Sequence, residues 1–247
     1  MSENTPVAST TSPTVVLVHG AFADSSGWAG VIDRLQGAGV EVTTAVNPLR
    51  SVTQDSAYLA SLLHQIEGPV LLVGHSYGGV VITNAAAGAE NVVGLVFVAG
   101  FAPDEGESLM DIEVDSKDSV LNSSLLPLQY PLEDGAEPGI EFVIDPARYH
   151  DAFAADMPEE QTRIMAVSQR PAAALAFSEV SGTPAWKSLP SWAVIPTGDK
   201  AAGADVLRTM ADRAGATVVE VEGSHAIMIS QPQAVTDVIL TALKGVA

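Results

Sequence analysis

The sequence has no cysteine, little positive charge and no long hydrophobic run. Without cysteine, the 247 residues can form no disulfide, thiol nucleophile or thiolate metal site. Only 11 Lys and Arg residues stand against 30 Asp and Glu, a formal net charge of −19, so the surface field repels phosphate backbones and anionic lipids. We therefore expect no nucleic-acid partner and no membrane partner, and we interpret the charge as favouring solubility.

No stretch approaches the roughly 18 consecutive apolar residues that a membrane-spanning helix needs. Residues 1–13 lack the basic start and apolar middle of a signal peptide and are rich in Ser, Thr and Pro. We expect a disordered tail there and a cytoplasmic protein, which is a monomer or a homodimer. A chain of this length commonly folds as one α/β unit.

Short continuous apolar runs alternate with segments of helical periodicity. Such alternation predicts an α/β fold with a doubly wound, mostly parallel sheet, because strands covered on both faces are apolar throughout. The expected strands are residues 14–18, 40–46, 69–73, 92–99, 192–195 and 217–221. The expected helices are residues 28–37, 51–67, 80–87, 204–214 and 231–243.

The alternation stops between residues 104 and 190, where acidic residues and prolines are scattered among helical patches at 146–155 and 158–168. The apolar content of this stretch favours an inserted helical cap, or lid, over a disordered excursion. Residues 14–103 and 191–247 then form the core.

Residues 74–79, Gly-His-Ser-Tyr-Gly-Gly, join an expected strand to an expected helix. The Gly-x-Ser-x-Gly pattern in that position is typical of a nucleophile elbow, a sharp turn that lifts the serine hydroxyl out of the sheet. We predict that Ser76 is a nucleophile.

A serine hydroxyl needs a base to remove its proton and an acid to orient that base. His225 follows the last expected strand, at the carboxyl edge of the sheet where ligands bind, and is the predicted base. The remaining histidines are expected to have structural or surface roles: His19, His64, His75 and His150.

Asp199 follows the preceding strand, so sheet adjacency would place it beside His225. We favour it as the acid. Asp104 and Glu105, which follow the strand after the elbow helix, are the alternatives.

Acyl transfer also requires backbone N–H groups directed at the developing oxyanion. Tyr77, next to the nucleophile, is expected to supply one of them. Ala21, in the glycine-containing turn at residues 19–22, is expected to supply the other, with Phe22 in reserve. Apolar side chains are predicted to line the substrate pocket: Phe22, Trp28, Phe153 and Trp186, with Phe142 and Met157 as further candidates.

With these residues in place, the chain resembles the α/β-hydrolase superfamily, and within it the branch of methyl-ester esterases, hydroxynitrile lyases and their bacterial members. The resemblance depends on four segments: residues 18–21 with Trp28 downstream, residues 74–79, residues 198–199, and residues 225–228 leading to Pro232. It implies the α/β-hydrolase fold, a helical cap over the serine, and neither metal nor cofactor. One departure is residues 200–203, Lys-Ala-Ala-Gly, which lack the apolar or proline continuation usual after the acid.

Lyases of this branch carry a threonine in the first turn and a lysine after the catalytic histidine. Gly20 and Ala226 occupy those positions here, as in the esterases. The resulting hypothesis is a cofactor-free serine hydrolase that cleaves small carboxylic esters through an acyl-enzyme on Ser76. The alternatives are a hydroxynitrile lyase or other carbon-carbon lyase or hydrolase with the same triad, and a weakly hydrolytic ligand receptor.

Overall fold

The computed structural model describes residues 12–132 and 136–247, so the tail expected at residues 1–13 lies almost wholly outside the described residues. Six strands form a sheet in the order β2-β1-β3-β4-β8-β9, and each neighbouring pair is parallel. These strands are β1 (Thr14–Val18), β2 (Val42–Ala45), β3 (Val70–His75), β4 (Val92–Val98), β8 (Ser191–Pro196) and β9 (Thr217–Val221). The predicted parallel α/β sheet is confirmed, with strand ends within a residue or two of those expected.

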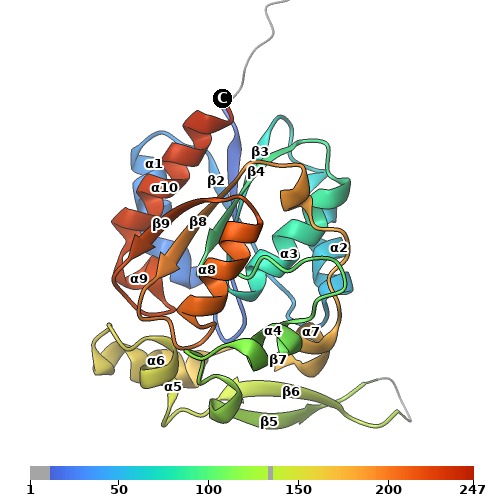
Figure 1. Ribbon diagram of the computed structural model, residues 1–247, viewed down its shortest axis with the longest axis vertical. Coiled ribbons are helices and arrows are strands. Elements are labelled where there is room, and N and C mark those ends of the chain that lie inside the picture. The colour runs from blue at the N-terminus through green and yellow to red at the C-terminus, as the bar shows by residue number, and fades with distance from the viewer. Residues whose placement is uncertain (1–11, 133–135) are drawn as a thin grey trace, which may run out of the picture.

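Helices cover both faces of this sheet (Figure 1). On one face lie α1 (Ala29–Gly37), α9 (Ile227–Ser230) and α10 (Pro232–Gly245). On the other lie α2 (Val52–Leu63), α3 (Tyr77–Ala85) and α8 (Ala204–Arg213). The first turn of α2 is capped by Ser51, whose side chain accepts a hydrogen bond from the Gln54 N–H at 3.1 Å.

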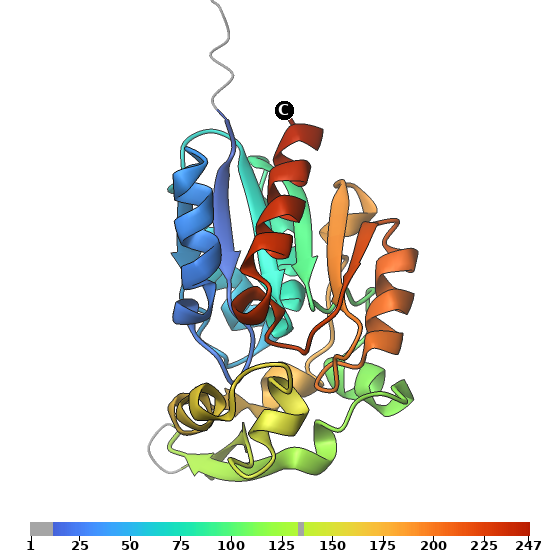
Figure 2. The same ribbon diagram turned by 90° about the vertical axis from the view of Figure 1, so that its left-hand side faces the viewer.

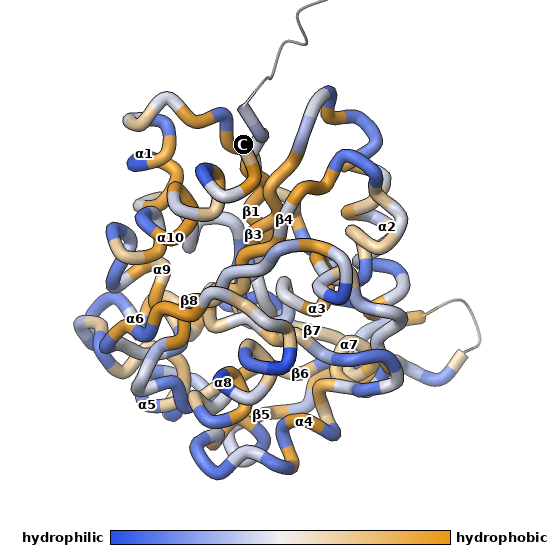
Figure 3. Tube along the Cα trace, turned by 45° about the horizontal axis from the view of Figure 1, so that its top comes forward, coloured by the Kyte–Doolittle hydropathy of each residue, from blue (hydrophilic) through white to orange (hydrophobic). Residues whose placement is uncertain are grey.

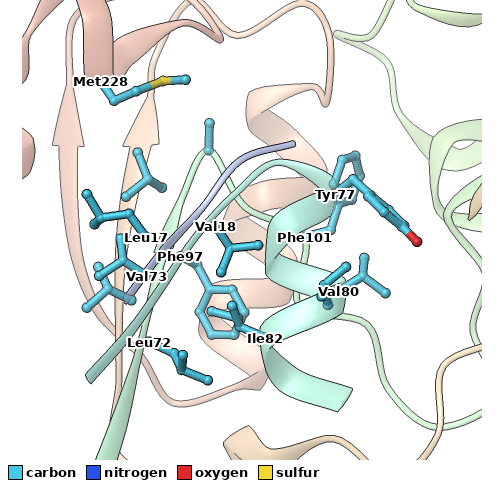
Figure 4. Packing of buried hydrophobic residues seen from close by; sticks show 14 of the residues in the cluster. Leu17, Val18, Leu72, Val73, Tyr77, Val80, Ile82, Phe97, Phe101 and Met228 are labelled. Atoms are coloured by element: carbon cyan, nitrogen blue, oxygen red, sulfur yellow. The ribbon is translucent and has the colours of Figure 1, made fainter. Parts of the chain in front are cut away.

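The core lies between the helices and the central strands. Every residue of β1, β3 and β8 is buried, which explains why these strands are apolar except at one end residue each rather than alternating. Figure 3 shows the apolar colour concentrated along the central strands, and Figure 4 shows Leu17, Leu72 and Phe97 packed around them with Ile82 of α3.

The segment between β4 and β8, which we call the cap, lies across the end of the sheet to which the strands point (Figures 1 and 2). Its helices are α4 (Leu109–Asp115), α5 (Tyr149–Phe153), α6 (Glu159–Ser168) and α7 (Ala174–Ser178). Helices α5 and α6 fall within the two patches of helical periodicity. That the cap acts as a lid stays a prediction.

The cap also contains an antiparallel sheet that the sequence did not indicate. Its strands are β5 (Leu125–Tyr130), β6 (Gly139–Ile144) and β7 (Ala172–Ala173), in that order. All of β5 is at least partly exposed, and Pro127 lies inside it. Without a buried face, the strand has no alternation of apolar and polar residues from which it could have been predicted.

Within residues 12–132 and 136–247, none of the helices combines the length and the apolar character that crossing a lipid bilayer requires.

Candidate active site

Ser76 occupies the sharp turn between β3 and α3. Its backbone has φ 51° and ψ −124°, a conformation that L residues rarely adopt and that persists only where the surrounding structure enforces it. The Ser76 carbonyl accepts hydrogen bonds from the N–H groups of Gly79 at 2.8 Å and Phe101 at 3.2 Å. These contacts hold the strained turn in place.

Glycines make this turn possible because the chain segments around it touch. A Cβ atom on Gly74 would lie 2.5 Å from the Gly78 carbonyl oxygen, and one on Gly78 would lie 2.6 Å from the Val18 carbonyl oxygen. A Cβ on Gly20 would lie 2.6 Å from the Cβ of Ser76 itself. The first turn of the chain and the elbow are therefore in direct contact.

Asp199 and His225 meet at the ends of the neighbouring strands β8 and β9. The His225 Nδ1–H donates to Asp199 Oδ2 at 2.7 Å, and each residue is only 1% exposed. The second carboxylate oxygen, Oδ1, accepts from the backbone N–H groups of Ala201 and Ala202, both at 2.9 Å. The unusual residues 200–203 thus hold the carboxylate through their main chain, which any residue except proline can do.

His225 is fixed by its backbone as well as by Asp199. The ring of His75 donates from Nε2 to the His225 carbonyl oxygen at 3.0 Å, and the ring of Phe153 packs edge-on against the His225 ring with centroids 4.9 Å apart. The Ala226 N–H donates to the Phe153 carbonyl oxygen at 3.1 Å, which ties this loop to the cap. Burial lowers the pKa of His75 well below its usual value, so its ring is a neutral support.

Ser76 and His225 face a common cavity. It is enclosed and small, with a volume of about 20 Å³, room for roughly one water molecule. No hydrogen bond joins Ser76 to His225 among the described residues. The lining residues come from both the core and the cap: Ala21, Phe22, Ser76, Tyr77, Phe101, Leu109, Glu113, Leu121, Phe153, Phe177, Ala201, Ala202 and His225.

Ala21, Phe22 and Tyr77 line this cavity, and within residues 12–132 and 136–247 none of their backbone N–H groups has a hydrogen-bond partner. Tyr77 begins α3, and the first N–H groups of a helix have no intrahelical acceptor. The reserve candidate, Phe22, has φ 59° and uses its carbonyl to accept from the Tyr149 hydroxyl at 3.3 Å.

His19 supports the turn that carries Ala21. Its Nδ1–H donates to the Gly20 carbonyl oxygen at 2.9 Å, and its Nε2 accepts from the Asn47 N–H at 3.0 Å. Burial lowers the pKa of His19, so the ring is neutral. The structural role expected for this histidine matches these contacts.

The alternative acids do not reach His225. Asp104 pairs with Lys187 at 2.5 Å, and Glu105 accepts a hydrogen bond from the Thr183 hydroxyl at 2.9 Å. The remaining histidines also lie apart from Ser76. His64 is exposed at the end of α2, and the His150 ring bonds to the Thr162 hydroxyl at 3.1 Å.

The expected aromatic pocket is only partly present. Phe22 and Phe153 line the cavity, but Trp28 and Trp186 do not, and the part of all four in a substrate pocket stays a prediction. Trp28 is fully buried beneath His75, with ring centroids 6.4 Å apart, and Trp186 donates from its indole N–H to the Pro103 carbonyl oxygen at 3.0 Å. Neither of the further candidates, Phe142 and Met157, lines the cavity.

Other lining residues were missed. Phe101 follows β4 without a motif, while Glu113 and Phe177 belong to cap helices that the sequence pattern did not indicate. A wider hollow of about 510 Å³ between α5 and α6 holds none of the three predicted triad residues. Among residues 12–132 and 136–247, no group of three or more His, Asp or Glu side chains is arranged to hold a metal ion.

Residues 15–238 match the sequence model described as the alpha/beta hydrolase family. The chain is also 33% identical over 108 residues to a carbendazim hydrolyzing esterase of Nocardioides sp. (strain SG-4G). That match covers 38% of this chain and 45% of the relative, so it spans less than half of the relative's length.

Solved structures share the fold at low sequence identity. Polyneuridine aldehyde esterase superposes with a TM-score of 0.75 at 22% identity, covering 94% of this chain and 99% of that one. The methylesterase MES16 from Arabidopsis gives a TM-score of 0.76 at 20% identity, with the same coverage of 94% and 99%. Tomato Methylketone Synthase I gives 0.76 at 20% identity, with coverage of 96% and 100%.

Proposed function

The chain belongs to the α/β hydrolase family, and from that premise we propose that it hydrolyses small carboxylic esters, without a cofactor, through an acyl-enzyme on Ser76. The main support for the proposal is the buried hydrogen bond of 2.7 Å between Asp199 and His225, together with the cavity that His225 and Ser76 both line. The names of the relatives, an esterase that hydrolyses carbendazim and a methylesterase, support the same reaction class.

The first half of the reaction forms the acyl-enzyme. His225 takes the Ser76 proton on Nε2 as the Ser76 oxygen attacks the ester carbonyl carbon, and Asp199 holds the opposite ring nitrogen and stabilises the imidazolium. The negative charge that develops on the carbonyl oxygen is met by the N–H groups of Ala21 and Tyr77. His225 then gives its proton to the departing alcohol oxygen as the carbon-oxygen bond breaks.

The second half returns the enzyme to its starting state. His225 removes a proton from water, the hydroxide adds to the acyl carbon, and the carboxylic acid leaves as Ser76 regains its proton. A cavity of about 20 Å³ cannot hold an ester beside this water, so we propose that the cap moves away from the sheet to admit substrate.

The environment of Gly20 favours an esterase over a hydroxynitrile lyase. A side chain at position 20, where lyases of the resembling branch carry threonine, would place its Cβ 2.6 Å from the Ser76 Cβ and 2.8 Å from the His75 carbonyl oxygen. Ala226, where those lyases carry lysine, is fully buried. The site therefore has neither group, and a side chain at position 20 has no room without a shift of the elbow.

The proposal is tested with p-nitrophenyl acetate and the variants Ser76→Ala and Ser61→Ala. Ser61 is exposed on α2, so its variant is a matched control. Loss of the nucleophile is expected to lower kcat by at least about 10⁴-fold, with the control unchanged. Equal rates for the parent and Ser76→Ala would overturn the assignment, and Ser76-dependent cyanide release from mandelonitrile would support the lyase instead.

A further inference from the structure

A carboxyl group that the triad does not use lies in the wall of the catalytic cavity. Glu113 of α4 is only 7% exposed and lines the same cavity as Ser76 and His225. Its Oε2 lies 2.6 Å from the Ser119 hydroxyl oxygen, while its Oε1 is buried and has no hydrogen-bond partner among the described residues. A buried carboxyl oxygen without a hydrogen bond destabilises the folded state, so its presence in a cavity wall suggests a role.

The contacts of Ser119 indicate which form of Glu113 the site holds. The Ser119 hydroxyl oxygen lies 2.6 Å from Glu113 Oε2 and 2.7 Å from the Ala201 carbonyl oxygen, but a hydroxyl has one proton and can donate to only one of them. Both contacts are hydrogen bonds only when Glu113 is protonated. Its Oε2–H then donates to Ser119, and Ser119 donates to Ala201.

The surroundings favour the same neutral form. Burial raises the pKa of Glu113 to about 8, and the facing carboxylates of Asp199, in the acid loop, and Asp205, in α8, raise it as well. The hydrogen bond with Ser119 acts in the opposite direction. At neutral pH the unpartnered Oε1 is then the carbonyl oxygen of a carboxylic acid, which can only accept a hydrogen bond.

We propose that Glu113 determines substrate specificity by accepting, at Oε1, a hydrogen bond from a neutral hydroxyl or N–H group on the acyl or alcohol part of the ester. The inference rests on the proposed function and narrows its substrate class. Apart from Glu113, Ser76 and His225 the lining is mostly apolar, so one buried acceptor discriminates strongly between substrates: one without a matching donor leaves Oε1 unpaired.

Two substitutions separate hydrogen bonding from packing. In Glu113→Gln the amide N–H₂ can donate to Ser119 and the amide oxygen remains an acceptor, so the neutral acid is mimicked. In Glu113→Leu the donor to Ser119 and the acceptor oxygen are both lost, while the volume of the side chain stays similar. If Glu113→Leu does not fold, Glu113→Met replaces it. Two matched ester pairs test where the hydroxyl donor lies. Methyl 6-hydroxyhexanoate, compared with methyl hexanoate, carries it on the acyl part, and 2-hydroxyethyl butanoate, compared with ethyl butanoate, carries it on the alcohol part.

Binding is measured by calorimetry on the Ser76→Ala background, and hydrolysis by pH-stat titration on the parent background. We expect at least one hydroxyl ester to bind about tenfold more tightly than its plain partner, Glu113→Gln to keep this ratio, and Glu113→Leu or Glu113→Met to abolish it. A ratio near one in both pairs, or a ratio that survives in the leucine or methionine variant, overturns the proposal.

The two proposals fail in different ways. If the parent hydrolyses no ester while Ser76→Ala shows the Glu113-dependent binding ratio, the esterase assignment is wrong and the recognition role stands. If the parent hydrolyses all four esters with no dependence on Glu113, the esterase stands and the recognition role is wrong.

Discussion

Ser76 keeps a backbone conformation with φ 51° because its neighbours leave no alternative. Gly20 contributes to that constraint from a distant part of the sequence, since its missing side chain leaves only enough space for the Ser76 Cβ. Strain of this kind costs on the order of 1–3 kcal/mol and is found where a side chain must be presented to a substrate.

Replacing Gly20 by alanine is expected to displace the elbow. The added Cβ would lie 2.6 Å from the Ser76 Cβ and 2.8 Å from a main-chain oxygen, and main chain cannot move aside cheaply. We expect kcat/KM to fall by about 100-fold, since a displacement near 1 Å can cost that much. Gly37→Ala is the control, because nothing lies within 4 Å of the Cβ it adds; equal activity of the two variants contradicts the packing described here.

Asp199→Asn tests the acid while keeping its loop. The Asn oxygen can still accept from Ala201 and Ala202, but its N–H₂ group then faces His225 Nδ1 and forces the proton onto Nε2, where it blocks the base. The expected loss in kcat is about 10⁴-fold. Asp104→Asn removes the charge that pairs with Lys187, while its amide oxygen can still accept from the Glu105 N–H. This variant is expected to retain activity, and a loss larger than that of Asp199→Asn would assign the acid to Asp104.

The raised pKa of Glu113 should make the free energy of unfolding depend on pH. Its pKa rises from an ordinary value of 4.5 to about 8 on folding, so between these values the folded chain holds a proton that the unfolded chain has lost. The free energy of unfolding therefore falls as pH rises through this window, by up to about 1.4 kcal/mol per pH unit. Urea unfolding at pH 5 to 8 should show that Glu113→Gln lacks this component; identical pH slopes for the variant and the parent would count against a raised pKa.

The sequence was informative for residues whose position follows from topology. Ser76, Asp199 and His225 each come directly after a buried strand, and parallel strands deliver such residues to one edge of a sheet. The sequence was less informative for Trp28 and Trp186, which do not line the cavity, because an aromatic residue near the site has no pattern that tells whether its ring faces the cavity or the core.

The ends of the parallel strands supply the candidate site, and the cap contributes Glu113, Phe153 and Phe177 to the wall of its cavity. The core helices and strands could be predicted because burial on both faces makes the strands apolar and gives the helices a regular period. The sheet of β5, β6 and β7 could not, since β5 has no buried residue and β7 is only two residues long, so neither strand has an apolar pattern of its own.

Arg170 links the cap to the first turn of the core. Its guanidinium donates to the Asn47 carbonyl oxygen at 2.9 Å and lies 3.2 Å from the Nε2 of His19, the residue that supports the turn carrying Ala21. Arg170→Met removes the hydrogen bond to the Asn47 carbonyl oxygen, and the loss is expected to lower the free energy of unfolding by about 1–3 kcal/mol. It also removes the contact with His19 and is expected to lower kcat. Arg163→Met, on the exposed face of α6, is the control; melting curves and kinetics that match between the two variants would contradict the link.

At the scale of the molecule, a net charge of −19 makes the folded chain repel itself. Raising the ionic strength from about 0.01 M to about 0.15 M shortens the screening length from about 30 Å to about 8 Å. We expect Tm to rise by a few degrees over this range, equally in sodium chloride and choline chloride. A Tm that stays unchanged or falls with added salt would show that repulsion among the acidic residues does not destabilise the folded chain.

We propose that Ser76, His225 and Asp199 act together as a nucleophile, a base and an acid. The most direct test of this proposal is the intact mass of the protein after reaction with a fluorophosphonate, followed by mapping of the labelled residue. One adduct is expected, on Ser76, with labelling abolished in Ser76→Ala and slowed in Asp199→Asn. An unlabelled parent, or an adduct on any other residue, would contradict the proposal.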